Sequence, residues 1–147
     1  MKTKSSASLG LLLLTFMFGC SGKPSMSELQ EKFERDSQWT RTLAAGAAKV
    51  KTFEKVDALM TEVAGVKHYT MGYKVEMECT APFFIIEGPG DNEYEVYLDN
   101  AEFADLKRDY QGSFYMAKGY FVKELKPGDV DKRTGSVELT LFEKGWR

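Results

Sequence analysis

Regular alternation of apolar and polar residues between Val66 and Ala81 is the feature that most constrains how this chain folds. Every second residue from Tyr69 to Ala81 is apolar or aromatic, and most residues between them are polar. Successive side chains of a β-strand point to opposite faces, so this spacing predicts a long strand with one buried face. Such a strand requires a sheet whose apolar side packs against a second layer.

Five further segments have the composition of shorter strands and are separated by residues that favour turns. Turn chemistry is densest at residues 88–92 and at residues 127–129, where Gly and Pro adjoin Asp. The predicted strands are Val50–Val56, Phe83–Ile86, Glu93–Leu98, Phe114–Leu125 and Ser136–Phe142.

An amphipathic segment precedes the strands. Apolar residues recur at steps of three or four through Met26–Ala48, which predicts one long helix. Ser25 stands three residues before Glu28, and Ser27 three before Gln30, so either serine could begin the helix with a capping box.

A second, shorter helix is predicted at Asn100–Tyr110, with Asn100 as its cap. One leading helix followed by strands favours an α+β fold, in which the N-terminal helix packs on a curved antiparallel sheet of about four to six strands. This element order resembles that of cystatin-like and NTF2-like domains. The resemblance covers Met26–Trp146 as element order only and implies no site residues. We therefore expect a single domain over residues 26–147.

The amino end has the charge and hydropathy order of a secretory signal. Lys2 and Lys4 precede an almost wholly apolar segment at residues 9–18. This segment has the length of a signal-peptide core and is shorter than the ~20 residues that a spanning helix needs. We predict residues 1–19 to be a signal peptide.

The apolar segment ends in Met17-Phe18-Gly19-Cys20, which resembles the lipobox of bacterial lipoproteins. The resemblance implies that Cys20 is the lipidation site and the first mature residue, that residues 20–25 form a short tether, and that the membrane is bound through this lipid anchor. Ser21, in place of an Asp that retains such proteins at the inner membrane, implies the outer membrane, facing the periplasm. The alternatives are an ordinary signal followed by an unmodified cysteine, or a buried helix with Cys20 in its core.

Composition excludes several classes of function. The formal net charge is −2, without clustered basic residues, so nucleic acid is not an expected partner. With Cys20 acylated, Cys79 is the one remaining thiol, which leaves no intramolecular disulfide. One further Cys and one His cannot supply a structural zinc site. We predict no metal and no cofactor.

Two residues could carry catalysis, and neither has a convincing setting. His68, the one histidine, falls on the polar face of the long predicted strand, where an exposed or hydrogen-bonded role is expected. Cys79 falls on the apolar face and has no basic neighbour in sequence, so it is interpreted as a small buried residue. We predict that the protein is not an enzyme.

Acidic residues near the turns are interpreted as solvated carboxylates. A calcium loop beginning at Asp129 would need a Glu at its twelfth position, where the chain has Thr140. The residues concerned are Asp91, Glu93, Glu95, Asp129 and Asp131.

Two functional hypotheses remain open. The first is a noncatalytic interaction module of the envelope, membrane-anchored, with an envelope protein as its partner. The second is a small-ligand-binding or enzymatic domain that uses the concave face of the sheet. The candidate binding face for the second is Tyr69, Tyr73, Phe114 and Tyr120, the last two from an aromatic segment with apolar residues on both strand faces.

Overall fold

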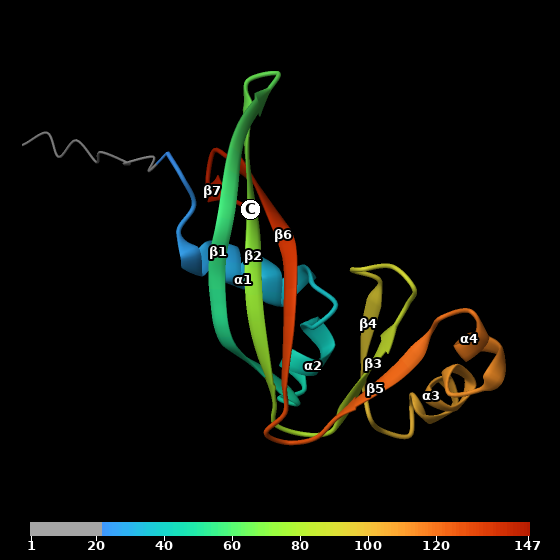
Figure 1. Cartoon of the computed structure of the whole chain (residues 1–147). Coiled ribbons are helices and arrows are strands. Elements are labelled where there is room, and N and C mark those ends of the chain that lie inside the picture. The colour runs from blue at the N-terminus through green and yellow to red at the C-terminus, as the bar shows by residue number, and fades with distance from the viewer. Residues whose placement is uncertain (1–21) are drawn as a thin grey trace, which may run out of the picture.

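The computed structural model describes residues 22–147 and has an α+β architecture in which two antiparallel sheets are covered by helices (Figure 1). The first sheet has the strand order β1-β2-β6-β7 and the second the order β4-β3-β5. The elements are α1 (Met26–Asp36), α2 (Thr40–Ala44), β1 (Ala48–Val63), β2 (Val66–Cys79), β3 (Phe83–Glu87), β4 (Tyr94–Leu98), α3 (Ala104–Tyr110), α4 (Ser113–Ala117), β5 (Phe121–Leu125), β6 (Val130–Phe142) and β7 (Gly145–Trp146).

The α+β class and the antiparallel pairing are thus confirmed, and the strands divide between two sheets. The predicted signal peptide and Cys20 lie outside the described residues. Within residues 22–147, no helix combines the length and the apolar character needed to cross a membrane.

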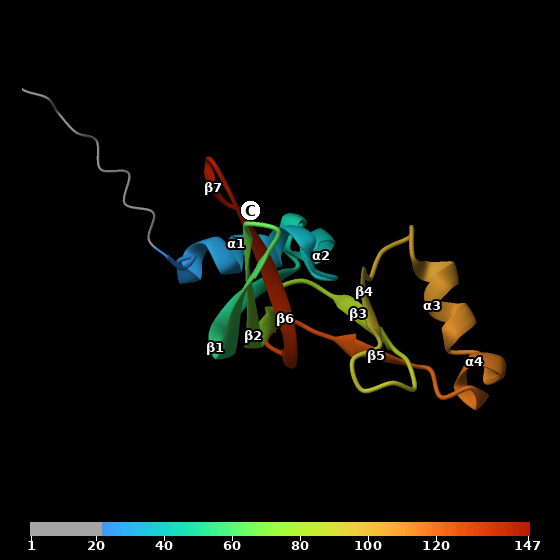
Figure 2. The ribbon, with the colours of Figure 1, turned by 90° about the horizontal axis from the view of Figure 1, so that it is seen from above.

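Strand β2 confirms the alternation that the sequence predicts. Its odd-numbered side chains from Tyr69 to Cys79 are buried and its even-numbered ones are half-buried or exposed. Helix α1 lies across the buried face, to which it contributes Leu29 and Phe33 (Figure 2). The contact between α1 and the first sheet thus forms part of the main core.

Helix α1 begins with the predicted capping box but is shorter than expected. Ser25 Oγ accepts from the backbone N–H of Glu28, whose carboxylate accepts in return from the Ser25 N–H. The prediction of one helix to Ala48 is wrong, because the backbone is extended at Ser37 and α2 follows as a separate short helix. The break turns Trp39 fully into the core.

Strand β3 is buried on both faces and holds the two sheets and their helices together. Phe83 and Ile85 belong to the main core, whereas Phe84 and Ile86 pack toward Phe103 beside α3. Figure 2 shows α1 and α2 on one side of the second sheet and α3 and α4 on its other side. The second sheet therefore lies between α2, which contacts β4, and α3, which contacts β3 and β5.

Strand β1 extends seven residues beyond the predicted end at Val56, and pairs with β2 as far as Val63 opposite Val66. The two-residue turn between them consists of Ala64 and Gly65, both with positive φ (51° and 80°). Such turns match the twist of a hairpin, and glycine or asparagine normally occupies them. Ala64 is not typical of this turn, which is why the sequence did not reveal the long hairpin.

The predicted strand at Phe114–Leu125 is wrong in its first half. Residues Ser113–Ala117 form α4, Gly119 then reverses the chain at φ 85°, and only Phe121–Leu125 is a strand. The other predicted helix begins later than expected, at Ala104, and Asn100 Oδ1 accepts from the Glu102 N–H ahead of it instead of capping it. Strand β6 begins at Val130, six residues before the predicted Ser136.

Candidate functional site

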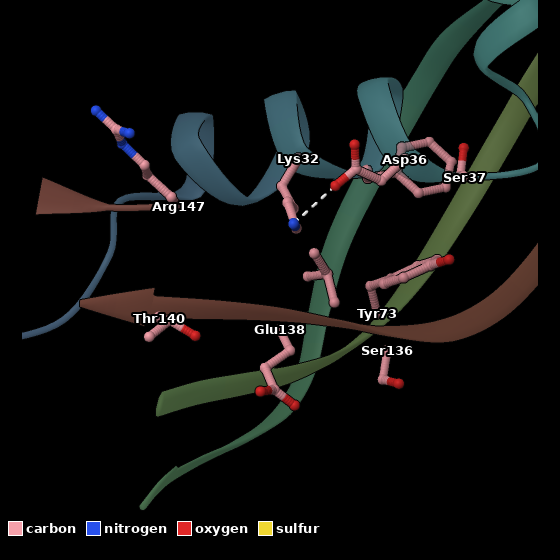
Figure 3. Close-up of a pocket in the computed structure, with 10 residues that line it drawn as sticks. Lys32, Asp36, Ser37, Tyr73, Ser136, Glu138, Thr140 and Arg147 are labelled. Atoms are coloured by element: carbon pink, nitrogen blue, oxygen red, sulfur yellow. Dashed lines mark ion pairs between the residues drawn. The ribbon is translucent and has the colours of Figure 1, made fainter. Parts of the chain in front are cut away.

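A groove between α1 and β6 is the candidate functional site. It encloses about 470 Å³ and continues to the carboxyl-terminal residue Arg147 (Figure 3). Its lining comes from four separate parts of the chain: Lys32, Phe33, Asp36, Ser37, Tyr73, Ser136, Val137, Glu138, Thr140 and Arg147.

The floor of the groove is a cluster of aromatic rings around Tyr73. The Tyr73 ring lies 5.2 Å from that of Phe33 on α1 and 5.1 Å from that of Phe53 on β1. Its phenol lies over Gly135, where an added Cβ would be 2.5 Å from Tyr73 Oη. The absence of a side chain at Gly135 therefore makes room for this ring.

Two charged groups at the rim, Lys32 and Asp36, form an ion pair with each other. Lys32 Nζ lies 2.7 Å from Asp36 Oδ2, one helical turn away. The hydrogen bond from Lys32, and then that from Arg35, holds the pKa of the Asp36 carboxyl below its ordinary value. Both partners remain partly exposed, so this pair contributes little to stability.

The polar side chains from β6 do not point into the groove. Figure 3 shows Ser136, Glu138 and Thr140 directed away from α1. They lie on the outer face of the sheet because alternate residues of a strand share a face, and Val137 between them packs into the core. The groove thus offers an aromatic floor and a few charged groups at its rim, while the side chains of Ser136, Glu138 and Thr140 point away from it.

Burial of Tyr73 predicts a loss of stability at alkaline pH. Burial raises the pKa of its phenol to about 12, from an ordinary value of 10.0. The folded state therefore favours the neutral phenol, and this contribution is complete below pH 10 and lost as the pH rises from 10 toward 12. We expect melting temperatures to fall across that range. The fall should be smaller in Tyr73→Phe, and identical pH dependence in the two proteins would contradict the assignment.

The four residues of the predicted binding face are not brought together. Tyr69 and Tyr73 are buried in the main core, under α1 and beside Trp146. Phe114 is 63% exposed on α4, on the far side of the second sheet. Tyr120 borders a different cavity, of about 360 Å³, where its hydroxyl donates to Glu93 Oε1 at 2.9 Å.

The two candidate catalytic residues lie on opposite faces of β2. His68 is on the outer face, where its Nδ1 is 3.2 Å from both Glu138 Oε1 and Thr140 Oγ1. Cys79 is 1% exposed, its thiol donates to the Ala81 carbonyl, and burial raises its pKa. Both settings agree with the structural roles that the sequence suggested. Among residues 22–147, no three acidic, His or Cys side chains form a group that could hold a metal ion.

The acidic residues behave as predicted with one exception. Asp91, Glu93 and Glu95 are exposed, and Asp129 is an exposed turn residue whose carboxylate accepts from the Lys126 N–H. Asp131, in contrast, is 1% exposed, so its assignment as a solvated carboxylate is wrong.

Asp131 is the centre of a buried ionic cluster that sequence reasoning missed. Arg133 Nε donates to its Oδ2 at 2.5 Å, and Lys123 of β5 forms a second ion pair with it. Arg133 also pairs with Glu87 of β3 and lies 4.4 Å over the ring of Tyr94. The cluster joins the two sheets. The available signal was the spacing of Asp131 and Arg133, which places both on one face of a strand.

Comparisons of the chain with protein family models, with curated proteins and with solved structures gave no match.

Proposed function

We propose that the protein is a bacterial envelope lipoprotein, anchored by acylated Cys20 to the outer membrane and facing the periplasm. The observation that carries this proposal is the order of a basic start, a short apolar segment and Gly19-Cys20, followed closely by a folded domain. The capping box at Ser25 fixes the start of that domain five residues after Cys20. A chain of five residues reaches at most about 18 Å, so acylation would keep the domain at the membrane surface.

In this proposal the domain is a noncatalytic interaction module whose partner is another envelope protein. Catalysis requires polar groups that converge on one reacting atom. The side chains of Ser136, Glu138 and Thr140 point away from the groove, which supports a binding role. The separation of His68 from Cys79 and the raised pKa of the Cys79 thiol support it further.

A small-ligand function is the second candidate, and the size of the groove favours it. A volume of about 470 Å³ falls within the range of ligand-binding pockets. A helix across a curled sheet also supports assignment to the cystatin-like or NTF2-like domains. Against a ligand site on the concave face of that sheet, α1 already packs on it over Tyr73.

Replacing Cys20 tests the anchor. We expect Cys20→Ser to move the protein from the membrane fraction to the soluble fraction, or to leave an uncleaved precursor, because acylation needs the thiol. Ser21→Ala, one residue later, should remain membrane-bound. Fractionation and intact mass spectrometry are the measurements. A Cys20→Ser protein with unchanged mass and unchanged fractionation would exclude the lipoprotein assignment.

Crosslinking in intact cells separates the two functional candidates. A recurrent protein crosslinked to the domain and identified by mass spectrometry would support the interaction module. The ligand-binding alternative would be supported by a small molecule that co-purifies with the domain. That molecule should be lost when a large side chain fills the groove, as in Ser37→Trp.

A further inference from the structure

The distal end of the β1–β2 hairpin exposes apolar side chains on both of its faces. Val63 and Val66 face each other across the turn and are 63% and 39% exposed. Leu59 is four residues before Val63 in β1, is 64% exposed and lies on the same face as Val63. Met60 is 37% exposed and lies on the opposite face. Phe142, near the end of the neighbouring β6, is 55% exposed. We call Leu59, Met60, Val63 and Val66 the hairpin tip.

This arrangement fits immersion in an apolar layer better than docking of a protein on one face. A protein partner would cover one side of the hairpin, but both sides carry exposed apolar groups. The backbone groups between the two strands are paired up to Val63 and Val66. The charges nearest the turn, Glu62 and Lys67, are opposite each other in register, so the tip has no net charge there. Such a surface suits uncharged and zwitterionic lipid.

The path of the chain brings the tip to the same end of the domain as the proposed anchor. Figure 3 shows Arg147 next to the amino-terminal part of α1, and the backbone of Arg147 pairs with that of Thr140 on β6. Thr140 pairs with His68, which stands three residues from the turn, or about 10 Å along the strand. Figure 1 shows residues 22–25, in blue ahead of α1, rising toward the end of the sheet where the tip projects. The proposed tether, of at most about 18 Å, and the hairpin tip therefore extend from the same end of the domain.

We propose that the hairpin tip inserts into the interfacial layer of the lipid bilayer to which Cys20 is anchored. The domain then has two points of contact with the membrane, the acyl chains and the tip, which fix its orientation. The inference rests on the proposed anchoring at Cys20. It adds a lipid-binding surface on the folded domain, distinct from the groove.

A fluorescent label at the tip tests the insertion. Full-length protein carrying Thr61→Cys, an exposed site between Leu59 and Val63, is labelled with a polarity-sensitive thiol dye and reconstituted in phosphatidylcholine vesicles. We expect a blue-shifted emission that brominated acyl chains quench. Lys126→Cys, exposed in the turn at the opposite end of the sheet, is the matched site and should show neither effect. A dye at residue 61 as solvated as one at residue 126 would overturn the proposal.

Serine replacement of the tip completes the test. The triple variant Leu59→Ser, Val63→Ser and Val66→Ser should lose most of the quenching at residue 61, and the single variant Val63→Ser should lose part of it. Phe114→Ser with Met116→Ser, at exposed positions of α4, should not change the quenching. Quenching that persists in the triple variant would contradict insertion by these side chains. A dye at residue 61 that is shielded from water in cell membranes but solvated in pure lipid vesicles would also contradict the proposal, because that result would indicate a protein partner.

One further labelling experiment separates this inference from the anchor. Protein without an added cysteine reports any free thiol at Cys20, since Cys79 is buried. A reactive Cys20 would contradict acylation. The dye on a Cys20→Ser, Thr61→Cys protein would then label residue 61 alone and still report contact of the tip with lipid.

Discussion

Trp39→Ala is expected to lower the free energy of unfolding by about 3–5 kcal/mol, the usual cost of truncating a fully buried large aromatic residue. Trp39 is 0% exposed and belongs to the main core, where it packs on the second sheet. Its ring is edge-on to Phe83 at 5.6 Å, and its Nε1 donates to the Tyr94 hydroxyl at 3.3 Å. Removing it leaves a cavity in the main core beside Phe83 and Tyr94 of the second sheet.

Chemical denaturation with two comparison variants measures this effect. Trp39→Phe keeps a ring in the cavity and should lose less stability than Trp39→Ala. Phe114→Ala truncates an aromatic residue that is 63% exposed and should change stability by about 0.5 kcal/mol or less. If Trp39→Ala and Phe114→Ala had similar effects, the packing described for Trp39 would be incorrect.

Arg133→Met is expected to have a comparable effect, about 3–5 kcal/mol, because it breaks a buried ion pair and leaves the partner charge behind. Asp131 is 1% exposed and would keep only Lys123, whose side chain is 42% exposed. Glu87 would lose its partner as well. Burial lowers the pKa of the Arg133 guanidinium, but hydrogen bonds to Asp131 and Glu87 outweigh burial and raise it.

Lys132→Met is the matched control for Arg133→Met. Lys132 is the adjacent residue, points to the other face and forms an exposed ion pair with Glu76. Exposed pairs contribute about 0–1 kcal/mol, so this variant should unfold almost as the parent does. The double variant Asp131→Leu with Arg133→Met should recover part of the loss, since it removes both buried charges. A double variant no more stable than Arg133→Met would mean that the cost lies in packing and not in the unpaired carboxylate.

The elements that could be predicted from the sequence are those whose burial follows a simple period. Strand β2 alternates because one face is covered by α1, and the periodicity of Tyr69–Cys79 shows this directly. Strand β1 could not be delimited, because its residues beyond Val56 are exposed on both faces and have no burial period. Segment 114–125 was misassigned because the apolar residues on both strand faces also suit a short helix, and Gly119 ends that helix.

The sites depend on contacts between segments that are distant in the chain. The groove is lined by α1, β2, β6 and the carboxyl terminus, and the sequence does not show which faces of these elements meet. Asp131 has the local sequence of an exposed turn carboxylate, and its burial follows from Lys123, Arg133 and Glu87 converging in the folded chain. His68 and Cys79 could be assigned correctly because each lies on a strand whose alternation was visible.

The segment that contains the second sheet leaves the first sheet at the end of β2 and rejoins it beside the same residue, at the start of β6. The Cys79 N–H donates to the Asp129 carbonyl and the Gly128 N–H donates to the Cys79 carbonyl, both at 2.9 Å. Residues 80–128 therefore form a closed excursion between two neighbouring strands, β2 and β6. The free energy of closing such a loop grows only slowly with its length. Insertions and deletions inside the excursion can thus accumulate during evolution without shifting the register of β2 against β6, whereas a single residue added within β6 would turn its buried face outward.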